Sequence, residues 1–178
     1  MEANFKQSLI WVREEEGGND DDPMDSGGRT SRGITQREYD AYCRIAGLTL
    51  GDVWKAPDQI VDDIYHKSYW NPYCPTFPTG IDYLFFDHGV LAGPSCATIA
   101  LQQALGVTAD GHIGVVTSAA LSHADPSELV DRMSAVRQQY YDEVVKLHPK
   151  NQKFMRGWAN RVVFARKNAH ALLAGGHV

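Results

Sequence analysis

Apolar and polar positions near the start of the chain recur with the period of a helix. Phe5, Leu9 and Val12 are spaced four and three residues apart, and at about 100° per residue they lie within roughly 60° of one another around a helix. The pair Gly17-Gly18 follows, and glycine is the usual residue just beyond a helix C-terminus. The pattern therefore predicts an amphipathic helix over residues 4–16.

Three glutamates close this predicted helix, and their angles around the helix axis separate them. Measured from Phe5, Glu16 lies at about 20°, inside the apolar stripe, whereas Glu14 and Glu15 lie at about 180° and about 280°. Burial and the negative end of the helix dipole would both favour the protonated form of Glu16, which is the form that a general acid needs. The alternative is a frayed acidic helix end, in which Glu16 is a partly solvated charge.

Helical patterns recur along the rest of the chain, whereas no alternating pattern of strand length does. Thr35 and Glu38 form the capping box of a helix that should end before Gly47. The only strands expected form a small hairpin between about Arg29 and Ile34. The other predicted helical segments cover 50–54, 57–70, 94–104, 126–147 and 151–173, with a further helix after an Asp110-Gly111 turn. The chain is therefore predicted to be mainly α, with a small hairpin after the first helix.

Two polar residues interrupt the apolar run Ile81–Leu91, namely Asp87 and His88. A carboxylate in a core must be hydrogen-bonded or paired, so Asp87 is interpreted either as a helix cap or inter-helix hydrogen-bond acceptor, or as a functional group. His88 is interpreted as solvated or hydrogen-bonded, because no histidine pair at i, i+4 with a carboxylate indicates zinc. Further along, one stripe is expected in the core, formed by Leu129, Met133, Val136, Tyr140 and Val144.

Candidate chemistry follows directly after the first helix. Asp25 lies nine residues after Glu16, and Thr30 lies five further on, in a glycine-rich stretch that permits tight reversals. A buried acid, a carboxylate across a turn and a hydroxyl that can position water together suit a glycosidase. The run Asp20–Asp22 could instead suggest a calcium loop, but its acids do not alternate and no glutamate follows at EF-hand spacing. The candidate catalytic residues are Glu16, Asp25 and Thr30, with no metal and no cofactor expected.

The motifs of this stretch resemble those of glycoside hydrolase family 108. The resemblance is carried by Glu16-Gly17-Gly18, Asp22-Pro23 and Asp25-x-Gly27-Gly28-x-Thr30-x-x-Gly33-Ile34-Thr35. That family comprises N-acetylmuramidases found as phage endolysins and secretion-associated muramidases, so the resemblance implies a lysozyme-like helical fold and Glu16 as the catalytic acid. The spacing of eight residues between Glu16 and Asp25 also resembles that of phage-type lysozymes. In those enzymes five residues usually separate the aspartate from the threonine, whereas four separate Asp25 from Thr30 here.

The second half of the chain resembles the peptidoglycan-binding domain that commonly follows the family 108 catalytic region. The matching residues are Leu101–Gly106, Asp110–Gly114, Thr117, Arg137, Tyr140-Tyr141 and Gly157–Arg161. The resemblance therefore implies a catalytic region over residues 1–92 and a helical peptidoglycan-binding region over residues 93–178 packed on it.

Aromatic residues near the end of the predicted helix 57–70 allow two interpretations. Tyr69 and Trp70 could stack on sugar rings in a glycan cleft, although an aromatic pair at a helix end is more often core. A similar Tyr-Trp pair occurs near this place in family 108. Tyr69, Trp70 and Asp87 are therefore the candidate substrate-binding residues.

The expected function is hydrolysis of the β-1,4 bond between N-acetylmuramic acid and N-acetylglucosamine, by a phage endolysin or a secretion-linked muramidase. The alternative is a non-catalytic peptidoglycan-binding or secretion-accessory protein that kept the fold. Whether the reaction retains or inverts configuration depends on the carboxyl separation, since about 5 to 5.5 Å favours retention and about 6.5 to 9.5 Å favours inversion.

Charge is distributed unevenly along the 178 residues. Residues 1–63 carry 14 acidic and 7 basic side chains, whereas residues 144–178 carry 7 basic side chains and no acidic one. The basic segment could meet nucleic acid, anionic envelope polymers or a membrane surface, or it could face the acidic part of the same fold. A net charge of −5 argues against a dedicated nucleic-acid binder. The resemblance to family 108 implies peptidoglycan as the partner, and the protein is expected to be a monomer.

Cysteine usage and hydropathy indicate the compartment. Cys43, Cys74 and Cys96 are widely spaced and lack partners at zinc spacing, so they are interpreted as reduced thiols of a chain made in the cytoplasm. No signal peptide is expected, because no charged segment followed by an apolar run opens the chain. No apolar stretch has transmembrane length, so stable membrane insertion is not expected. Release to the cell wall in the periplasm would then need a holin or another export route.

Overall fold

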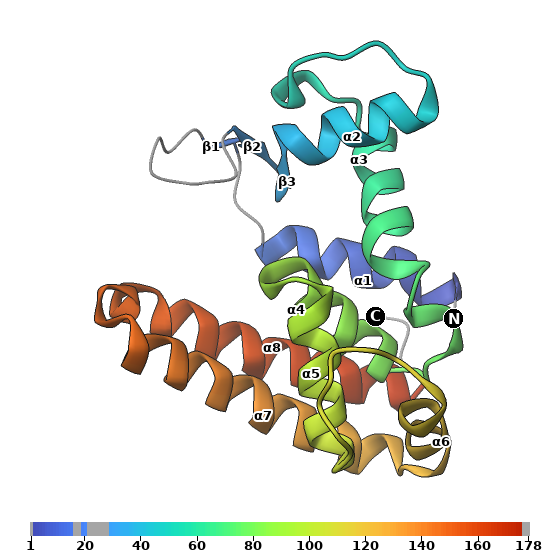
Figure 1. The fold of residues 1–178 in the computed structure, drawn as a ribbon, viewed down its shortest axis with the longest axis vertical. Coiled ribbons are helices and arrows are strands. Elements are labelled where there is room, and N and C mark those ends of the chain that lie inside the picture. The colour runs from blue at the N-terminus through green and yellow to red at the C-terminus, as the bar shows by residue number, and fades with distance from the viewer. Residues whose placement is uncertain (1, 16–18, 21–28, 176–178) are drawn as a thin grey trace. The chain divides into compact units, whose positions relative to one another are not determined.

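Helices dominate the secondary structure, and one small antiparallel sheet accompanies them (Figure 1). The computed structural model describes residues 2–15, 19–20 and 29–175. The backbone divides into two compact units, one formed by Phe5–Pro72 and the other by Tyr73–Val178 with Met1–Asn4. The prediction of a mainly α fold with a small hairpin after the first helix is confirmed.

The first helix carries the apolar stripe that its sequence pattern predicts. Helix α1 covers Glu2–Glu15, and Phe5, Leu9 and Val12 are all buried. The remaining elements of the unit Phe5–Pro72 are the strands β1 (Asn19–Asp20), β2 (Thr30–Ser31) and β3 (Ile34–Thr35), the helix α2 (Gln36–Ala46), a 3₁₀ helix (Val53–Lys55), the helix α3 (Asp58–Ile64) and a π-helical segment (Tyr65–Trp70).

A three-stranded antiparallel sheet in the order β1-β2-β3 follows helix α1. Arg32 and Gly33 join β2 to β3, and both have positive φ, at 51° and 77°. Positive φ at both central residues is the requirement of a type I′ turn, whose twist matches that of the two strands it joins. The hairpin predicted over residues 29–34 is confirmed. Strand β1 was not predicted, because a two-residue strand carries no alternating pattern.

Helix α2 begins and ends as its sequence signals predict. The Glu38 backbone N–H donates to Thr35 Oγ1 over 3.2 Å, and the Thr35 N–H donates to Glu38 Oε2 over 2.9 Å. Gly47 follows the helix in the left-handed conformation, with φ at 66°. The capping box and the glycine stop are therefore both confirmed. The predicted single helix over 57–70 is instead the short helix α3 followed by the π-helical segment.

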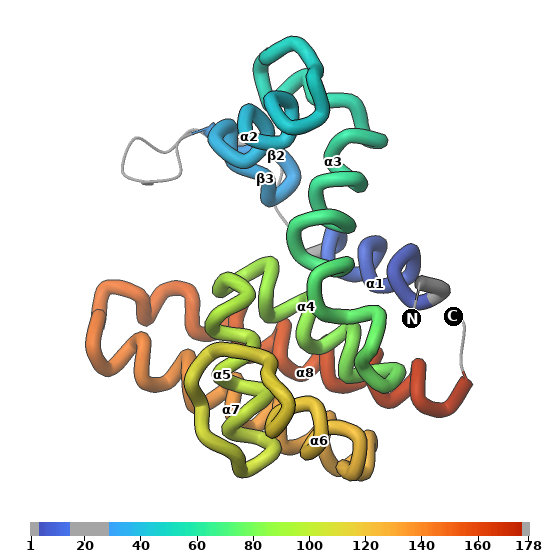
Figure 2. The backbone as a smooth tube through the Cα atoms, turned by 45° about the vertical axis from the view of Figure 1, so that its right-hand side comes forward, coloured from blue at the N-terminus to red at the C-terminus, as the bar shows by residue number. Residues whose placement is uncertain are grey.

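Helices α7 and α8 form a hairpin in the unit that begins at Tyr73, and they run side by side in opposite directions (Figure 2). Helices α4 and α5 pack against α7, and α4 also packs against α8. The elements of this unit are a 3₁₀ helix (Cys74–Thr76), α4 (Ile81–Ala92), α5 (Pro94–Leu105), α6 (Val115–His123), α7 (Pro126–Leu147), a 3₁₀ segment (Pro149–Phe154) and α8 (Met155–Leu173).

The start of α7 is confirmed by its cap, since the Glu128 N–H donates to the Asp125 side chain over 2.9 Å. The start of α8 was predicted too early, because the residues from Pro149 form a 3₁₀ segment before the α-helix begins at Met155. Spacing alone does not separate these two helix types, since both place residues three or four apart on one side.

The buried face of α7 differs from its predicted stripe in the second half of the helix. Leu129 and Met133 are buried as predicted. Tyr140, predicted in the core, is 36% exposed, and its place on the buried face is taken by Arg137 and Tyr141. A search for apolar residues cannot place an arginine in a core, because the burial of that charge depends on a partner from another helix.

Gln102 organises the connection between α5 and α6. Its side-chain Nε2 lies 2.7 Å from Asp110 Oδ1, 3.0 Å from the His112 carbonyl and 3.1 Å from Thr117 Oγ1. Its Oε1 accepts the N–H of Gly111 over 2.9 Å. The buried Gln102 side chain thus forms hydrogen bonds with the polar groups of the turn that the Asp110-Gly111 pair predicted. The residues of this motif are held in place by hydrogen bonds to one side chain.

Candidate active site

The predicted catalytic carboxylates Glu16 and Asp25 lie outside the described residues, whereas Thr30 lies inside them. In the sequence, Glu16 directly follows helix α1, and Asp25 lies between strands β1 and β2. The pairing of these strands sets Asp20 opposite Thr30. The described structure therefore fixes the helix before the predicted acid and the sheet after it.

Helix α1 is held within its unit by one ion pair and by aromatic packing. Arg13 Nη2 lies 2.6 Å from Asp62 Oδ1 on α3. Burial raises the pKa of Asp62 above its usual range, and the charge of Arg13 opposes that shift. Phe5 packs edge-on against His66 and also contacts Trp70, with ring centroids 4.8 and 5.5 Å apart. These contacts hold α1 against α3 and the π-helical segment.

Thr30 lies in a small network of hydrogen bonds around Trp54. The Trp54 indole N–H donates to the Thr30 carbonyl over 3.1 Å. The Arg29 guanidinium lies over the Trp54 ring, 4.4 Å from its centroid, and forms an ion pair of 3.0 Å with Asp52. Asp52 Oδ1 also accepts a hydrogen bond from the backbone N–H of Trp54 over 3.0 Å, as the N-cap of the 3₁₀ helix. The backbone of Thr30 is thereby fixed to this helix.

Trp54 is a candidate substrate contact that the sequence analysis missed. Its ring is 37% exposed, and it lies beside the one predicted catalytic residue that the structure describes. The sequence did contain a signal for the helical turn that carries Trp54, because Asp52, two residues earlier, is a capping residue. The pattern gave a helical turn there but did not indicate that it meets the hairpin.

The β2–β3 turn is fixed by its own arginine. Arg32 Nη2 donates to the Ala56 carbonyl over 2.7 Å, and its guanidinium also pairs with Asp58. The Tyr65 hydroxyl donates to the Arg32 carbonyl over 2.7 Å. The hairpin that carries Thr30 is thus braced on two sides by residues far along the chain.

The two predicted aromatic substrate contacts have different surroundings. Trp70 has 0% of its surface exposed and packs against Phe5, so its ring is not available for stacking on a sugar, and the core interpretation holds for it. Tyr69 is half-buried, and its hydroxyl donates to the carboxylate of Glu38. A contact between Tyr69 and substrate stays a prediction.

Asp87, also predicted to contact substrate, is a buried ion-pair centre instead. It is 1% exposed, and its Oδ2 accepts from Arg137 Nη1 over 2.5 Å while its Oδ1 accepts from Arg161 Nε over 3.0 Å. Burial opposes ionisation, but the two arginines hold the pKa of Asp87 below its usual range. The inter-helix interpretation is therefore correct for Asp87, because both oxygens already bind guanidinium groups and neither reaches solvent.

Several residues that resembled a peptidoglycan-binding motif surround this ion-pair centre. Arg137 Nε donates to the Tyr141 hydroxyl over 3.0 Å, and the Tyr141 ring stacks on Trp158 with centroids 5.0 Å apart. Arg137, Tyr141, Trp158 and Arg161 therefore join α4, α7 and α8. Arg137, Tyr141 and Arg161 are buried and Trp158 is half-buried, so the first three form part of the core of the helical unit.

His88 follows Asp87 in α4 and is equally enclosed. It is 2% exposed, and its Nε2 has no hydrogen-bond partner among the described residues. Burial lowers the pKa of His88 to about 3, with a further contribution from the charge of Arg137. The imidazole is therefore neutral at physiological pH. The expectation of a solvated or hydrogen-bonded histidine is wrong for its Nε2.

The mainly helical fold with a small sheet after its first helix is lysozyme-like. Residues 9–93 match the family model of glycosyl hydrolase 108, and residues 96–163 match that of a predicted peptidoglycan domain. The glycosyl hydrolase 108 match and the peptidoglycan-domain match therefore follow one another along the chain and together cover most of it.

A solved structure, that of Brucella abortus SagA, is similar to this chain over 97% of each chain, with a TM-score of 0.80 and 28% sequence identity. No curated protein matches the chain. The two family matches divide between residues 93 and 96, whereas the compact units divide between Pro72 and Tyr73. Helix α4 thus belongs to the first family match and to the second unit. The division expected after residue 92 stays a prediction.

Two further features bear on the setting of the site. None of the helices that the structure describes is both long and apolar enough to span a bilayer. Within the described ranges, no group of three or more His, Cys, Asp or Glu side chains is arranged to hold a metal ion.

The substitution Asp87→Asn should destabilise the fold strongly. It would leave Arg137 and Arg161 buried against a neutral amide, and removing one partner of a buried ion pair costs about 3 to 5 kcal/mol. Urea unfolding at pH 7 measures the loss. Asp131→Asn is the matched control, because Asp131 pairs with Arg166 over 2.8 Å at the surface, where such pairs contribute little. Equal losses in the two variants would contradict the structural role of Asp87.

The free energy of unfolding should decrease as the pH is lowered, because of His88. Its folded pKa of about 3 lies below its usual value of 6.5, so the unfolded chain takes up the proton first, and stability is lost as pH falls below about 6.5. Between pH 7.5 and pH 5 the loss should be about 2 kcal/mol.

Urea unfolding of the wild type and of His88→Leu at both pH values isolates this contribution. The variant should lose less stability than the wild type between pH 7.5 and pH 5, because its leucine does not titrate. The same pH dependence in both proteins would show that His88 does not bind its proton more weakly when folded.

Proposed function

We propose that the chain is an N-acetylmuramidase that cleaves the β-1,4 bond between N-acetylmuramic acid and N-acetylglucosamine, with Glu16 as its general acid. The observation that carries this proposal is the glycosyl hydrolase 108 match over residues 9–93, joined in one chain to a peptidoglycan-domain match over residues 96–163. A glycosidase next to a peptidoglycan-binding region has the bacterial cell wall as its substrate.

In the proposed reaction, Glu16 donates its proton to the glycosidic oxygen as the bond to the leaving sugar breaks. Asp25 either stabilises the oxocarbenium-like transition state or helps to activate water. Thr30 positions that water. The fixed backbone of Thr30, which accepts the Trp54 indole N–H, supports this role because a positioning hydroxyl must itself be held in place.

Trp54 is proposed to line the glycan-binding side of the site, together with Tyr69. Its partly exposed ring offers an apolar face beside Thr30, and an aromatic ring combines apolar area with little conformational freedom to lose. Arg29 over the same ring adds donors for sugar hydroxyl or carboxylate oxygens.

The proposed setting is the bacterial envelope. The enzyme would act as a monomer on peptidoglycan in the periplasm, after release by a holin as a phage endolysin or by a dedicated route as a secretion-linked muramidase.

Purified peptidoglycan should be hydrolysed by the wild type, with new muramic acid reducing ends, and not by Glu16→Gln. The amide preserves the shape of the side chain but has no carboxyl proton to donate, so kcat should fall by at least about a hundredfold. Analysis of the reducing ends identifies the bond, and circular dichroism checks that the variant is folded.

Glu14→Gln is the matched control for this experiment, because Glu14 is an exposed glutamate on the same helix. Its activity should equal that of the wild type. If Glu16→Gln cleaved as well as Glu14→Gln, the acid would lie elsewhere. If the wild type bound the polymer without cleaving it, the chain would be a non-catalytic peptidoglycan-binding protein.

Replacing Trp54 should weaken substrate binding more than it slows chemistry. Trp54→Ala removes the ring and should raise KM about tenfold, which corresponds to about 1.4 kcal/mol. Trp54→Phe keeps an aromatic face but loses the hydrogen bond to the Thr30 carbonyl, so it should retain most of the affinity. Initial rates on soluble peptidoglycan fragments measure both parameters. A loss in kcat that is the same for both variants would instead indicate that Trp54 acts only by holding the hairpin.

A further inference from the structure

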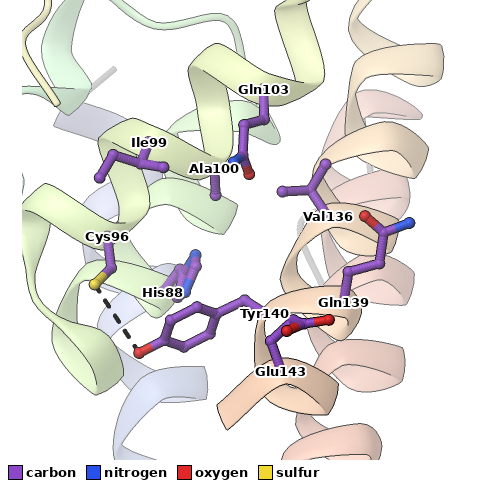
Figure 3. Close-up of a pocket in the computed structure, with 9 residues that line it drawn as sticks. All are labelled: His88, Cys96, Ile99, Ala100, Gln103, Val136, Gln139, Tyr140 and Glu143. Atoms are coloured by element: carbon purple, nitrogen blue, oxygen red, sulfur yellow. Dashed lines mark hydrogen bonds between the residues drawn. The ribbon is translucent and has the colours of Figure 1, made fainter. Parts of the chain in front are cut away.

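A cavity of about 310 Å³ opens between α4, α5 and α7 in the unit that begins at Tyr73 (Figure 3). Its walls are largely aliphatic and aromatic, with Ile99 and Ala100 from α5 facing Val136 and Tyr140 from α7. The volume lies at the lower end of the range for small-molecule pockets.

The back of the cavity holds a polar group without a partner. The His88 ring lies there between Cys96 and Tyr140 (Figure 3), and its Nε2 is buried with no hydrogen-bond partner among the described residues. An unsatisfied buried polar atom costs free energy, and such atoms in a native structure often mark a missing ligand or water. A ligand that offers a hydrogen bond at this depth would offset that cost.

The mouth of the cavity carries two carboxamides and one carboxylate. Gln103 on α5 faces Gln139 on α7 across the opening, and Glu143 lies one turn further along α7 (Figure 3). A carboxamide both donates and accepts, which matches a peptide bond. The carboxylate matches an ammonium group. None of the described residues that line the cavity is a lysine or arginine, so an anionic group of a ligand would have to lie outside it, in solvent.

The ion pair between Glu143 and Lys146 leaves the carboxylate available to a ligand. Its Oε1 lies 3.6 Å from Lys146 Nζ, and both side chains are mostly exposed. An exposed pair of this kind contributes little free energy, so the carboxylate remains open to a second ammonium group.

We propose that this cavity binds the stem peptide of peptidoglycan, a short alanine-containing peptide with a free side-chain amine. Its peptide bonds would lie between the carboxamides of Gln103 and Gln139, and its ammonium group would pair with Glu143. A small methyl side chain would enter the apolar space and bring a polar atom of the backbone to His88. Aliphatic walls suit this ligand better than the hydroxyl-rich glycan. The choice of peptidoglycan as the source of the peptide rests on the proposed function.

The test measures binding of a purified stem tetrapeptide that contains diaminopimelate to the full-length protein by titration calorimetry. Glu143→Gln should weaken binding about tenfold. Asp142→Asn is the matched control, because Asp142 is an exposed carboxylate on the same helix that does not line the cavity, and it should bind as the wild type does. Equal affinity in all three proteins would overturn the role of Glu143.

A chemically modified ligand tests the same contact from the other side. With the N-terminal amine of the peptide blocked in every sample, acetylation of its diaminopimelate side-chain amine should weaken binding to the wild type by the same factor as Glu143→Gln. It should cause no further loss in that variant, because the ammonium and the carboxylate form one interaction. Additive losses would show that the amine binds elsewhere.

Cys96 provides a reporter inside the cavity. It is half-buried, whereas Cys43 and Cys74 are buried, so a thiol reagent should modify Cys96 first, and Cys96→Ser should abolish that fast reaction. The stem peptide should slow the modification in the wild type. Val136→Trp, which fills the cavity from α7, should remove peptide binding without loss of peptidoglycan hydrolysis.

These outcomes separate the two proposals. Hydrolysis of peptidoglycan without binding of the stem peptide would overturn the peptide subsite and leave the muramidase standing. Binding of the peptide by a protein that does not hydrolyse the polymer would overturn the muramidase and leave the peptide subsite standing. Protection of Cys96 by a peptide-free glycan and not by the peptide would assign the cavity to sugar instead.

Discussion

The helical unit that begins at Tyr73 depends on one buried carboxylate. Asp87 on α4 binds Arg137 on α7 and Arg161 on α8, so a single side chain connects three helices. The burial of three charges is tolerated only because each finds a partner within hydrogen-bond distance. The apolar packing around them, including the stack of Tyr141 on Trp158, completes the enclosure. The cavity beside His88 is built on this framework, since His88 is the next residue of α4.

The unit Phe5–Pro72 uses polar contacts for a different purpose. Its sheet has strands of two residues each, too short to be stable by their own pairing. Trp54 and Tyr65 therefore brace the hairpin from outside by donating hydrogen bonds to its backbone carbonyls, and Arg32 of the turn itself donates to the Ala56 carbonyl. Such bracing holds Thr30 in a defined position, which a site that positions water requires.

The two units divide the proposed work between chemistry and recognition. The predicted catalytic residues belong to the first, and the cavity proposed for the stem peptide belongs to the second. Peptidoglycan contains both glycan and peptide, so a chain that contacts each part separately gains affinity through the linkage between them. In the second unit, the motif residues Arg137 and Arg161 form part of the core, whereas the motif residues Gln103 and Tyr140 line the cavity.

The sequence by itself determined most of the helices and indicated the chemistry that is proposed. Helix ends were predictable where a capping residue or a glycine acts locally, as at Thr35, Gly47, Asp125 and Gly106. The motif around Glu16 and Asp25 indicated a glycosidase because its residues lie close together in the chain. Only the tertiary structure decided that Asp87 and Trp70 are buried, that Arg137 belongs to the core, and that Trp54 meets Thr30. These facts depend on partners 20 or more residues away, and local patterns carry no information about such distant contacts.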